Sequence, residues 1–345
     1  MKDLVTGGAG FIGSHLVEAL LHRGDEVVVL DNLSTGSFRN LRHLAGHPGL
    51  VFLEESVLNR PVVERLVARA DRVFHLAAAV GVRYVVEHPL EALLTNIHGA
   101  EYVLEAAARD QKPVILFSTS EVYGKSDSVP FAESNDRVMG PTAVSRWGYA
   151  SSKAVDEFLA LAYHREHGLP VVIVRCFNTC GPRQTGHYGM VVPRIIQRAL
   201  AGQPIEVYGD GKQTRCFSFV GDVVRGVLLL ADCPTAYGEV FNIGTDEEVT
   251  INDLASRIRA QCQSSSPVVR IPYEEIYGSS FEDMRRRVPD LAKIDAYVGY
   301  RPEVRLDDLL ALTIQHMRSE TEELLVSRSL PSTSLASPAG IARNH

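Results

Sequence analysis

The most constraining feature of the chain is a glycine-rich turn close to its N-terminus. Residues 6–13 read TGGAGFIG, and they lie between the apolar pair Leu4 and Val5 and an amphipathic stretch that ends at Gly24. The glycines satisfy both G-x-G-x-x-G and G-x-x-G-x-x-G. A turn of this kind lets the backbone approach a pyrophosphate that rests on the N-terminus of the following helix. The pattern predicts a dinucleotide site that includes Gly7, Gly10, Phe11, Ile12 and Gly13.

The segment after this helix indicates which dinucleotide is bound. Residues 26–30 read EVVVL, typical of a strand, and they are followed by Asp31, 18 residues after Gly13. An acidic side chain at this point accepts hydrogen bonds from the adenosine ribose 2′-hydroxyl and repels a 2′-phosphate. We therefore expect NAD, rather than NADP, as the cofactor.

Apolar segments alternate with segments of helical periodicity through the first half of the chain. The expected strands are 4–5, 27–30, 50–53, 72–76, 113–117 and 170–174, and the main expected helices are 16–23, 87–109 and 148–168. This alternation predicts an α/β fold with a Rossmann-type, doubly wound parallel sheet. Past Arg175 the chain becomes richer in Gly and Pro, with helices expected near 191–201, 222–231 and 252–262 and a strand near 240–243.

This change of pattern predicts two domains. We expect residues 1–177, with parts of 216–245, to form an NAD-binding Rossmann domain. Residues 178–215 and 246–318 would form a smaller, discontinuous α/β domain that binds the substrate. The active-site cleft is expected between them, because ligands of open α/β sheets bind beyond the carboxyl ends of the strands. The Ser-, Pro- and Ala-rich residues 319–345 are expected to be a flexible tail.

Composition excludes several classes of function. The 345 residues include 35 Lys and Arg against 42 Asp and Glu, and no basic block is interleaved with aromatics, so we expect no nucleic-acid partner. No apolar run approaches the roughly 18 residues of a membrane span, and the N-terminus lacks the pattern of a signal peptide, so we expect a cytoplasmic protein without a membrane partner. The five cysteines and twelve histidines show no metal-ligand spacing, so no metal is predicted.

A second motif carries chemistry. Tyr149 and Lys153 are four residues apart in a segment with helical periodicity, which puts both side chains on one helix face. A neighbouring ammonium and the positive nicotinamide ring both favour a phenolate, so Tyr149 is expected to act as a base near neutral pH. A hydroxyl from residues 118–124, STSEVYG, would bridge a substrate oxygen and the tyrosine.

With these motifs the chain resembles the extended short-chain dehydrogenase/reductase family, the NAD-dependent sugar-nucleotide epimerases, dehydratases and decarboxylases. The resemblance runs from about Lys2 to Met317, and its further motifs are Asp31-Asn32, His75-Leu76-Ala77-Ala78, Asn96, residues 175–178, residues 181–184 and residues 208–215. It implies that Tyr149 deprotonates a sugar hydroxyl while the cofactor takes hydride from the same carbon. It also implies that Thr119 is the bridging hydroxyl and that Lys153 holds the nicotinamide ribose.

The resemblance assigns other side chains to the two ligands. For the cofactor it implies Asp31, Asn32, Leu76, Ala77, Ala78 and Asn96, in addition to the turn, Tyr149 and Lys153. For the substrate it implies Ser120, Asn178, Val191, Tyr208, Arg215 and Arg287. Among these, Asn178, Arg215 and one or more of residues 285–287 resemble the groups that hold the nucleotide diphosphate.

The branches of this family differ in the step after C4 oxidation, and three motifs bear on it. Ser120 stands where the 4,6-dehydratases of the dTDP-glucose type have an acid, which disfavours simple elimination. Glu121 together with Arg287 resembles the pair that attends the sugar acid in UDP-glucuronate decarboxylases. Residues 181–184 (GPRQ) followed by 188–193 (YGMVVP) resemble UDP-hexose and UDP-uronate 4-epimerases.

The first prediction is an NAD-dependent 4-epimerase that acts on a UDP-hexose or UDP-hexuronate through a 4-keto intermediate, because epimerisation makes the fewest demands on the site. Thr119, Tyr149, Lys153 and Glu121 are its expected catalytic residues. The alternatives are a UDP-glucuronate decarboxylase, an NDP-sugar 4,6-dehydratase, a GDP-mannose 3,5-epimerase and, more remotely, a non-catalytic NAD-binding module. The resemblance also implies a homodimer through the helices expected at 87–109 and 148–168.

Overall fold

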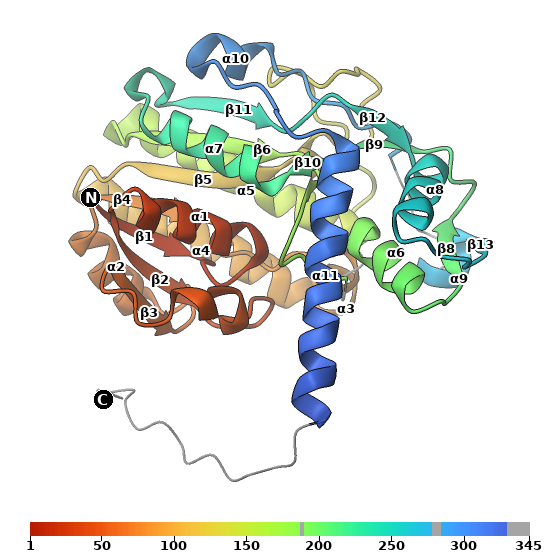
Figure 1. The fold of residues 1–345 in the computed structure, drawn as a ribbon. Helices are drawn as coiled ribbons and strands as arrows, with labels where there is room; N and C mark the ends of the chain where they lie inside the picture. Colours follow the sequence, from red (N-terminus) through yellow and green to blue (C-terminus); the bar gives the residue numbers. More distant parts are fainter. Residues whose placement is uncertain (187–189, 278–283, 330–345) are drawn as a thin grey trace.

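A seven-stranded parallel sheet forms the centre of the molecule (Figure 1). The computed structural model describes residues 1–186, 190–277 and 284–329. The strand order is β11-β6-β5-β4-β1-β2-β3. The chain adds β2 and β3 on one side of β1 and then adds β4, β5, β6 and β11 on the other side, which confirms the predicted doubly wound fold. The strands are β1 (Lys2–Thr6), β2 (Glu26–Asp31), β3 (Leu50–Glu54), β4 (Arg72–His75), β5 (Val114–Thr119), β6 (Val171–Cys176) and β11 (Glu239–Ile243).

Helices cover both faces of this sheet, which is why its strands are apolar on both sides. Successive residues of a strand point to opposite faces, so Val5 and Phe74 pack into one core and Leu4 and Val73 into the other. The first core is closed by α1 (Phe11–His22), the 3₁₀ helix η1 (Phe38–Leu44), α7 (Val220–Ala231) and α10 (Ala292–Val298). The second core is closed by α2 (Arg60–Arg69), α4 (Pro89–Arg109) and α5 (Arg146–His167).

A third core lies to one side of the sheet and is built from later parts of the chain. Ile195, Leu254 and Leu309 are fully buried in it. Its helices are α6 (Val191–Leu200), α8 (Ile251–Gln261) and the first part of α11 (Leu306–Ser329), and its strand pairs are β8 (Ile205–Tyr208) with β13 (Val268–Ile271) and β9 (Thr214–Cys216) with β12 (Glu248–Thr250). The separate core is compatible with the predicted substrate domain, whose boundaries stay a prediction.

The remaining elements are short. They are α3 (Val82–Glu87), α9 (Tyr273–Tyr277), the 3₁₀ helices η2 (Ser120–Tyr123) and η3 (Pro234–Ala236), and the paired strands β7 (Thr179–Cys180) and β10 (Ser218–Phe219). Among the described residues, no helix has both the length and the apolar character needed to cross a membrane.

Helix α11 corrects one expectation. It continues to Ser329, so residues 319–329 are helical and the prediction of a tail without regular structure from Ser319 is wrong for them; residues 330–345 lie outside the described residues. In Figure 1 the helix runs from the upper part of the molecule, near β10, down past α6 and α3. Its first turns are held by burial of Leu309, Leu310 and Ile314 in the third core.

Candidate active site

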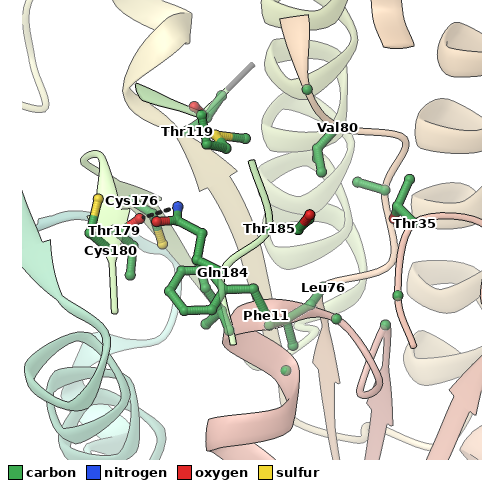
Figure 2. Close-up of a pocket in the computed structure, with 18 of the residues that line it drawn as sticks. Phe11, Thr35, Leu76, Val80, Thr119, Cys176, Thr179, Cys180, Gln184 and Thr185 are labelled. Atoms are coloured by element: carbon green, nitrogen blue, oxygen red, sulfur yellow. Dashed lines mark hydrogen bonds between the residues drawn. The ribbon is translucent and has the colours of Figure 1, made fainter. Parts of the chain in front are cut away.

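A cleft of about 940 Å³ opens at the carboxyl ends of β1, β4, β5 and β6. The sheet supplies one wall, and residues of the third core's elements, such as Val191 and Tyr208, supply the other. Figure 2 shows side chains around this pocket, among them Thr119 and Cys176 from strand ends and Phe11 from the start of α1. The cleft lies where the sheet topology predicts a ligand.

The glycine turn forms one end of the cleft, as predicted. Gly7 has a φ of +73°, and a Cβ on it would lie 2.7 Å from the backbone nitrogen of Ala77. A Cβ on Gly13 would lie 2.2 Å from the carbonyl oxygen of Gly7. Gly10 begins α1 without a side-chain cap, so the first N–H groups of the helix remain available to an anion. The turn therefore fits a pyrophosphate and would not tolerate larger residues at these two positions.

Asp31 lies at the end of β2 and lines the cleft beside Asn32. Its Oδ2 accepts a hydrogen bond from the backbone nitrogen of Ala9 (2.9 Å), and its Oδ1 accepts one from Leu33 (2.8 Å). Burial raises the pKa of Asp31, and these two hydrogen bonds oppose that rise. A carboxylate fixed in this way has lone pairs left for a ribose diol. The residues present thus fit NAD.

The segment after β4 supplies the next part of the wall. Leu76, Ala77 and Ala78 line the cleft, and the Ala77 nitrogen donates to the Thr6 hydroxyl at 3.2 Å. Asn96, predicted to bind the cofactor, lies behind the wall instead: its Oδ1 accepts from the Ala79 nitrogen (2.8 Å) and its Nδ2 donates to Ser152 (3.1 Å). Asn96 is 1% exposed, and its two hydrogen bonds connect the loop after β4 with α5; its contact with the cofactor stays a prediction.

Three of the four predicted catalytic side chains meet in the cleft. Tyr149 and Lys153 come from α5, and Thr119 comes from the end of β5. Burial raises the pKa of Tyr149, the charge of Glu121 raises it further, and a hydrogen bond with the Thr119 hydroxyl lowers it. The charge of Asp156 also raises the pKa of Tyr149, and the Lys153 ammonium pairs with this carboxylate at 2.8 Å.

A carboxylate and a guanidinium face each other next to this group. Glu121, on η2, accepts from Arg287 with 2.7 Å between Oε1 and Nη2. Arg287 is 5% exposed, and its Nη1 lies 3.4 Å from both the Ser120 hydroxyl and the Asn178 side-chain oxygen. The fold thus brings together four predicted residues that are separated by up to 167 positions in the chain.

The remaining predicted substrate residues line the far end of the cleft. Val191, Tyr208 and Arg215 all contribute to its surface. The Tyr208 ring lies under the guanidinium of Arg194, 4.0 Å from it, which leaves an aromatic group in the wall. Of the motif at 188–193, residues 188 and 189 lie outside the described residues.

Sequence reasoning missed several residues that line the cleft, among them Thr35, Glu55, Cys176, Arg194, Gln213, Tyr273, Met317 and Glu320. The side-chain nitrogen of Gln184, from the GPRQ motif, donates to the Thr179 carbonyl at 2.9 Å, a contact visible in Figure 2. Thr35 could have been found from its place just after Asp31 and Asn32. Cys176 and Gln213 lie within the motifs at 175–178 and 208–215, although no role was assigned to them. The others carry no local signal, since they reach the cleft only through the packing of distant segments.

Comparison with known proteins agrees with this geometry. A family model described as the NAD dependent epimerase/dehydratase family matches residues 4–244. The chain is 43% identical over 318 residues to the UDP-N-acetyl-alpha-D-glucosaminuronate decarboxylase of Bacillus cytotoxicus, covering 92% of this chain and 98% of the relative. It is 35% identical to UDP-glucuronic acid decarboxylase 1 of Danio rerio, covering 96% of this chain and 76% of the relative.

Solved structures show the same fold. The UDP-glucose 4-epimerase of Thermotoga maritima, solved with UDP-glucose, superimposes with a TM-score of 0.84 at 33% identity and covers 93% of this chain and 100% of its own. The UDP-glucuronic acid 4-epimerase of Bacillus cereus, solved with UDP-glucuronic acid and NAD, has a TM-score of 0.84 at 30% identity with the same coverage of both chains.

Proposed function

Because the chain belongs to the NAD-dependent epimerase/dehydratase family, we propose that it is a decarboxylase of a UDP-linked uronic acid. The observation that carries the proposal is the ion pair between the partly buried Glu121 and the buried Arg287, in the same cleft as Thr119 and Tyr149. The sequence favoured a 4-epimerase and kept decarboxylation as an alternative. The decarboxylase relatives now favour the alternative, and the relative from Bacillus cytotoxicus makes a 2-acetamido uronic acid the first substrate to test.

The chemistry begins at C4 of the sugar. When bound, NAD supplies the acceptor, and later the donor, of the C4 hydride. Tyr149, bridged by Thr119, takes the proton of the C4 hydroxyl. The resulting C4 ketone makes the C5 carboxylate a β-keto acid. Its C5–C6 bond can then break, with CO₂ leaving and the electron pair passing to the enolate.

The return steps complete the balance. A proton adds to C5, and O4 receives its proton from Tyr149 when the hydride returns to C4. The net change is uptake of one proton and loss of CO₂, with no net change of the cofactor. A buried guanidinium is suited to hold a carboxylate in two hydrogen bonds, so Arg287 would hold the sugar acid and Glu121 would orient Arg287.

A second candidate is 4-epimerisation, which the similarity to solved 4-epimerases favours. Both reactions begin with the same oxidation at C4. In decarboxylation the carboxylate is lost before the hydride returns. In epimerisation the keto sugar rotates, so that the hydride returns to the other face of C4.

Proton NMR in deuterated water separates the two candidates. The purified protein would be supplied with UDP-N-acetylglucosaminuronate, UDP-glucuronate and UDP-glucose in parallel. Decarboxylation predicts a pentose product from a uronate, with one solvent deuteron at C5. A product inverted at C4, with its carboxylate retained and no deuterium, would replace this proposal by epimerisation.

Variants test the roles of the residues. Tyr149→Phe should lower turnover by about 10²–10⁴-fold while NAD stays bound. Glu121→Gln and Arg287→Lys should reduce CO₂ release more than C4 oxidation, which is followed as absorbance near 340 nm. Arg286→Lys is the matched control, because Arg286 is exposed and pairs with Glu248 at 2.8 Å. Equal losses in Arg286→Lys and Arg287→Lys would contradict the assigned role of Arg287.

A further inference from the structure

A buried carboxylate lies behind the catalytic lysine. Asp156 is one turn further along α5, and its Oδ2 accepts a hydrogen bond from the Lys153 ammonium at 2.8 Å. Asp156 is fully buried and Lys153 is 2% exposed. Lys153 also lines the cleft, whereas Asp156 is not among the residues that line it. The sequence motif that identified Lys153 does not include Asp156.

Several titratable groups surround Lys153 and Tyr149 beside this carboxylate. Lys153 lies close to the thiol of Cys176 on β6 and to His75 at the end of β4, and burial together with the lysine charge lowers the pKa of His75 to about 3. Tyr149 is faced by Glu121 of η2, by Cys176 and by Asp156, and it packs against the cluster of Ala79, Val85 and Ala92.

The neighbouring carboxylate is engaged elsewhere. Glu157 forms two hydrogen bonds with Arg175, at 2.9 and 2.7 Å, and accepts a third from Ser118 at 2.5 Å. The second oxygen of Asp156, Oδ1, is buried and has no hydrogen-bond partner among the described residues. A buried carboxylate with one free oxygen is costly unless a charge compensates it, and the ammonium of Lys153 does so.

We propose that Asp156 is a positioning residue of the active site: its carboxylate fixes the Lys153 ammonium from behind and offsets its charge, so that the charge of the cofactor governs the protonation of Tyr149. This inference rests on the proposed use of Tyr149 as base and acid. An uncompensated ammonium would favour the phenolate in both halves of the reaction. With the carboxylate present, the positive oxidised nicotinamide favours the phenolate needed for C4 oxidation, and the neutral reduced ring favours the phenol needed to return the proton.

The first test measures binding of the cofactor alone, without any sugar. The dissociation constants of NAD⁺ and NADH are measured by calorimetry for the wild type and for Asp156→Asn. Only the oxidised ring is positive, so loss of the nearby negative charge should raise the ratio of the NAD⁺ constant to the NADH constant by about three- to tenfold. Glu166→Gln, which removes a charge from an exposed position of α5, should leave this ratio unchanged.

The second test is the pH profile of kcat/KM. Removing the negative charge lowers the pKa of Tyr149, so the acid limb of Asp156→Asn should move to lower pH by about 0.5–1 unit. Asp156→Glu keeps the charge and should keep both the profile and the cofactor ratio. If the Asn variant does not fold, Asp156→Ser provides the neutral side chain.

An unchanged ratio and an unchanged profile in the neutral variants would overturn the inference and leave Asp156 a structural residue. The cofactor ratio does not depend on which product is formed. Failure of the decarboxylase proposal would therefore appear in the NMR assay, and failure of the role of Asp156 would appear in the binding measurement.

Discussion

At the scale of single residues, the cleft depends on side chains that do not line it themselves. His75 is 1% exposed at the end of β4, and its Nδ1 shares a 2.8 Å hydrogen bond with the Thr6 hydroxyl. That hydroxyl accepts from the backbone of Ala77 in the cofactor wall. His75 thus supports the wall from behind, as its place after an apolar strand suggested.

His75 should make folding stability fall in mild acid. Burial lowers its pKa in the folded state to about 3, against 6.5 as the ordinary value. The stabilising contribution of the neutral imidazole is fully present above pH 6.5 and is lost as the pH falls towards 3. The reason is that His75 of the unfolded chain binds a proton at a higher pH than His75 of the folded protein. The free energy of unfolding should therefore lose about 2 kcal/mol from this group between pH 6.5 and pH 5.

Guanidinium unfolding at several pH values measures this effect. His75→Gln should show a shallower decline of stability than the wild type over that window, and a variant of the exposed His22, His22→Gln, should decline as the wild type does. Parallel declines for all three proteins would show that His75 is not the titrating group.

At the scale of elements, the turn between β1 and α1 is the most tightly built part of the site. Its backbone is packed so closely that no space is left for a Cβ between Gly13 and the carbonyl oxygen of Gly7. Helix α11 contributes to the cleft from a distance. Its first turns are buried in the third core, and Met317 and Glu320, further along the helix, line the cleft.

Gly13→Ala should abolish measurable NAD binding and destabilise the fold by about 1–3 kcal/mol, since the added Cβ would lie 2.2 Å from a backbone oxygen that cannot move aside. Calorimetric titration with NAD and thermal unfolding report the two effects. Gly148→Ala is the matched control: its Cβ would have its nearest neighbour, in Leu93, at 3.8 Å, and alanine is the better helix former there. NAD binding retained by Gly13→Ala would contradict the structure of the turn.

At the scale of the whole molecule, an apolar surface lies on the two long helices that the sequence implied as a dimer interface. Leu90 and Leu94 of α4 are 68% and 43% exposed, and Phe158 of α5 is 61% exposed. Helices α4 and α5 pack against each other, so these side chains belong to one helical layer. A homodimer stays a prediction, which the exposed apolar side chains support.

The double variant Leu94→Glu with Phe158→Glu should convert a dimer into a monomer, because it places charges where apolar side chains would be buried. Light scattering coupled to size-exclusion chromatography gives the mass directly. Leu229→Glu is the control, since Leu229 is 38% exposed on α7, which packs into the other core. A wild-type mass of one chain, or a dimer that survives the double change, would refute this interface.

The sequence alone determined the sheet, the glycine turn and the shared helix of Tyr149 and Lys153, because each depends on local patterns. Apolar segments that alternate with helical segments predicted β1 to β6, and Gly7, Gly10 and Gly13 identified the turn by their spacing. Tyr149 and Lys153 are four residues apart, and this spacing places them on one face of α5.

Only the tertiary structure decided how distant groups combine. It paired Glu121 with Arg287, moved Asn96 behind the cleft wall and brought α11 to the cleft. It also buried Tyr149 and placed it near Glu121, and both effects raise the pKa of its hydroxyl. Burial and electrostatic compensation depend on which segments meet in space, and sequence spacing does not contain that information.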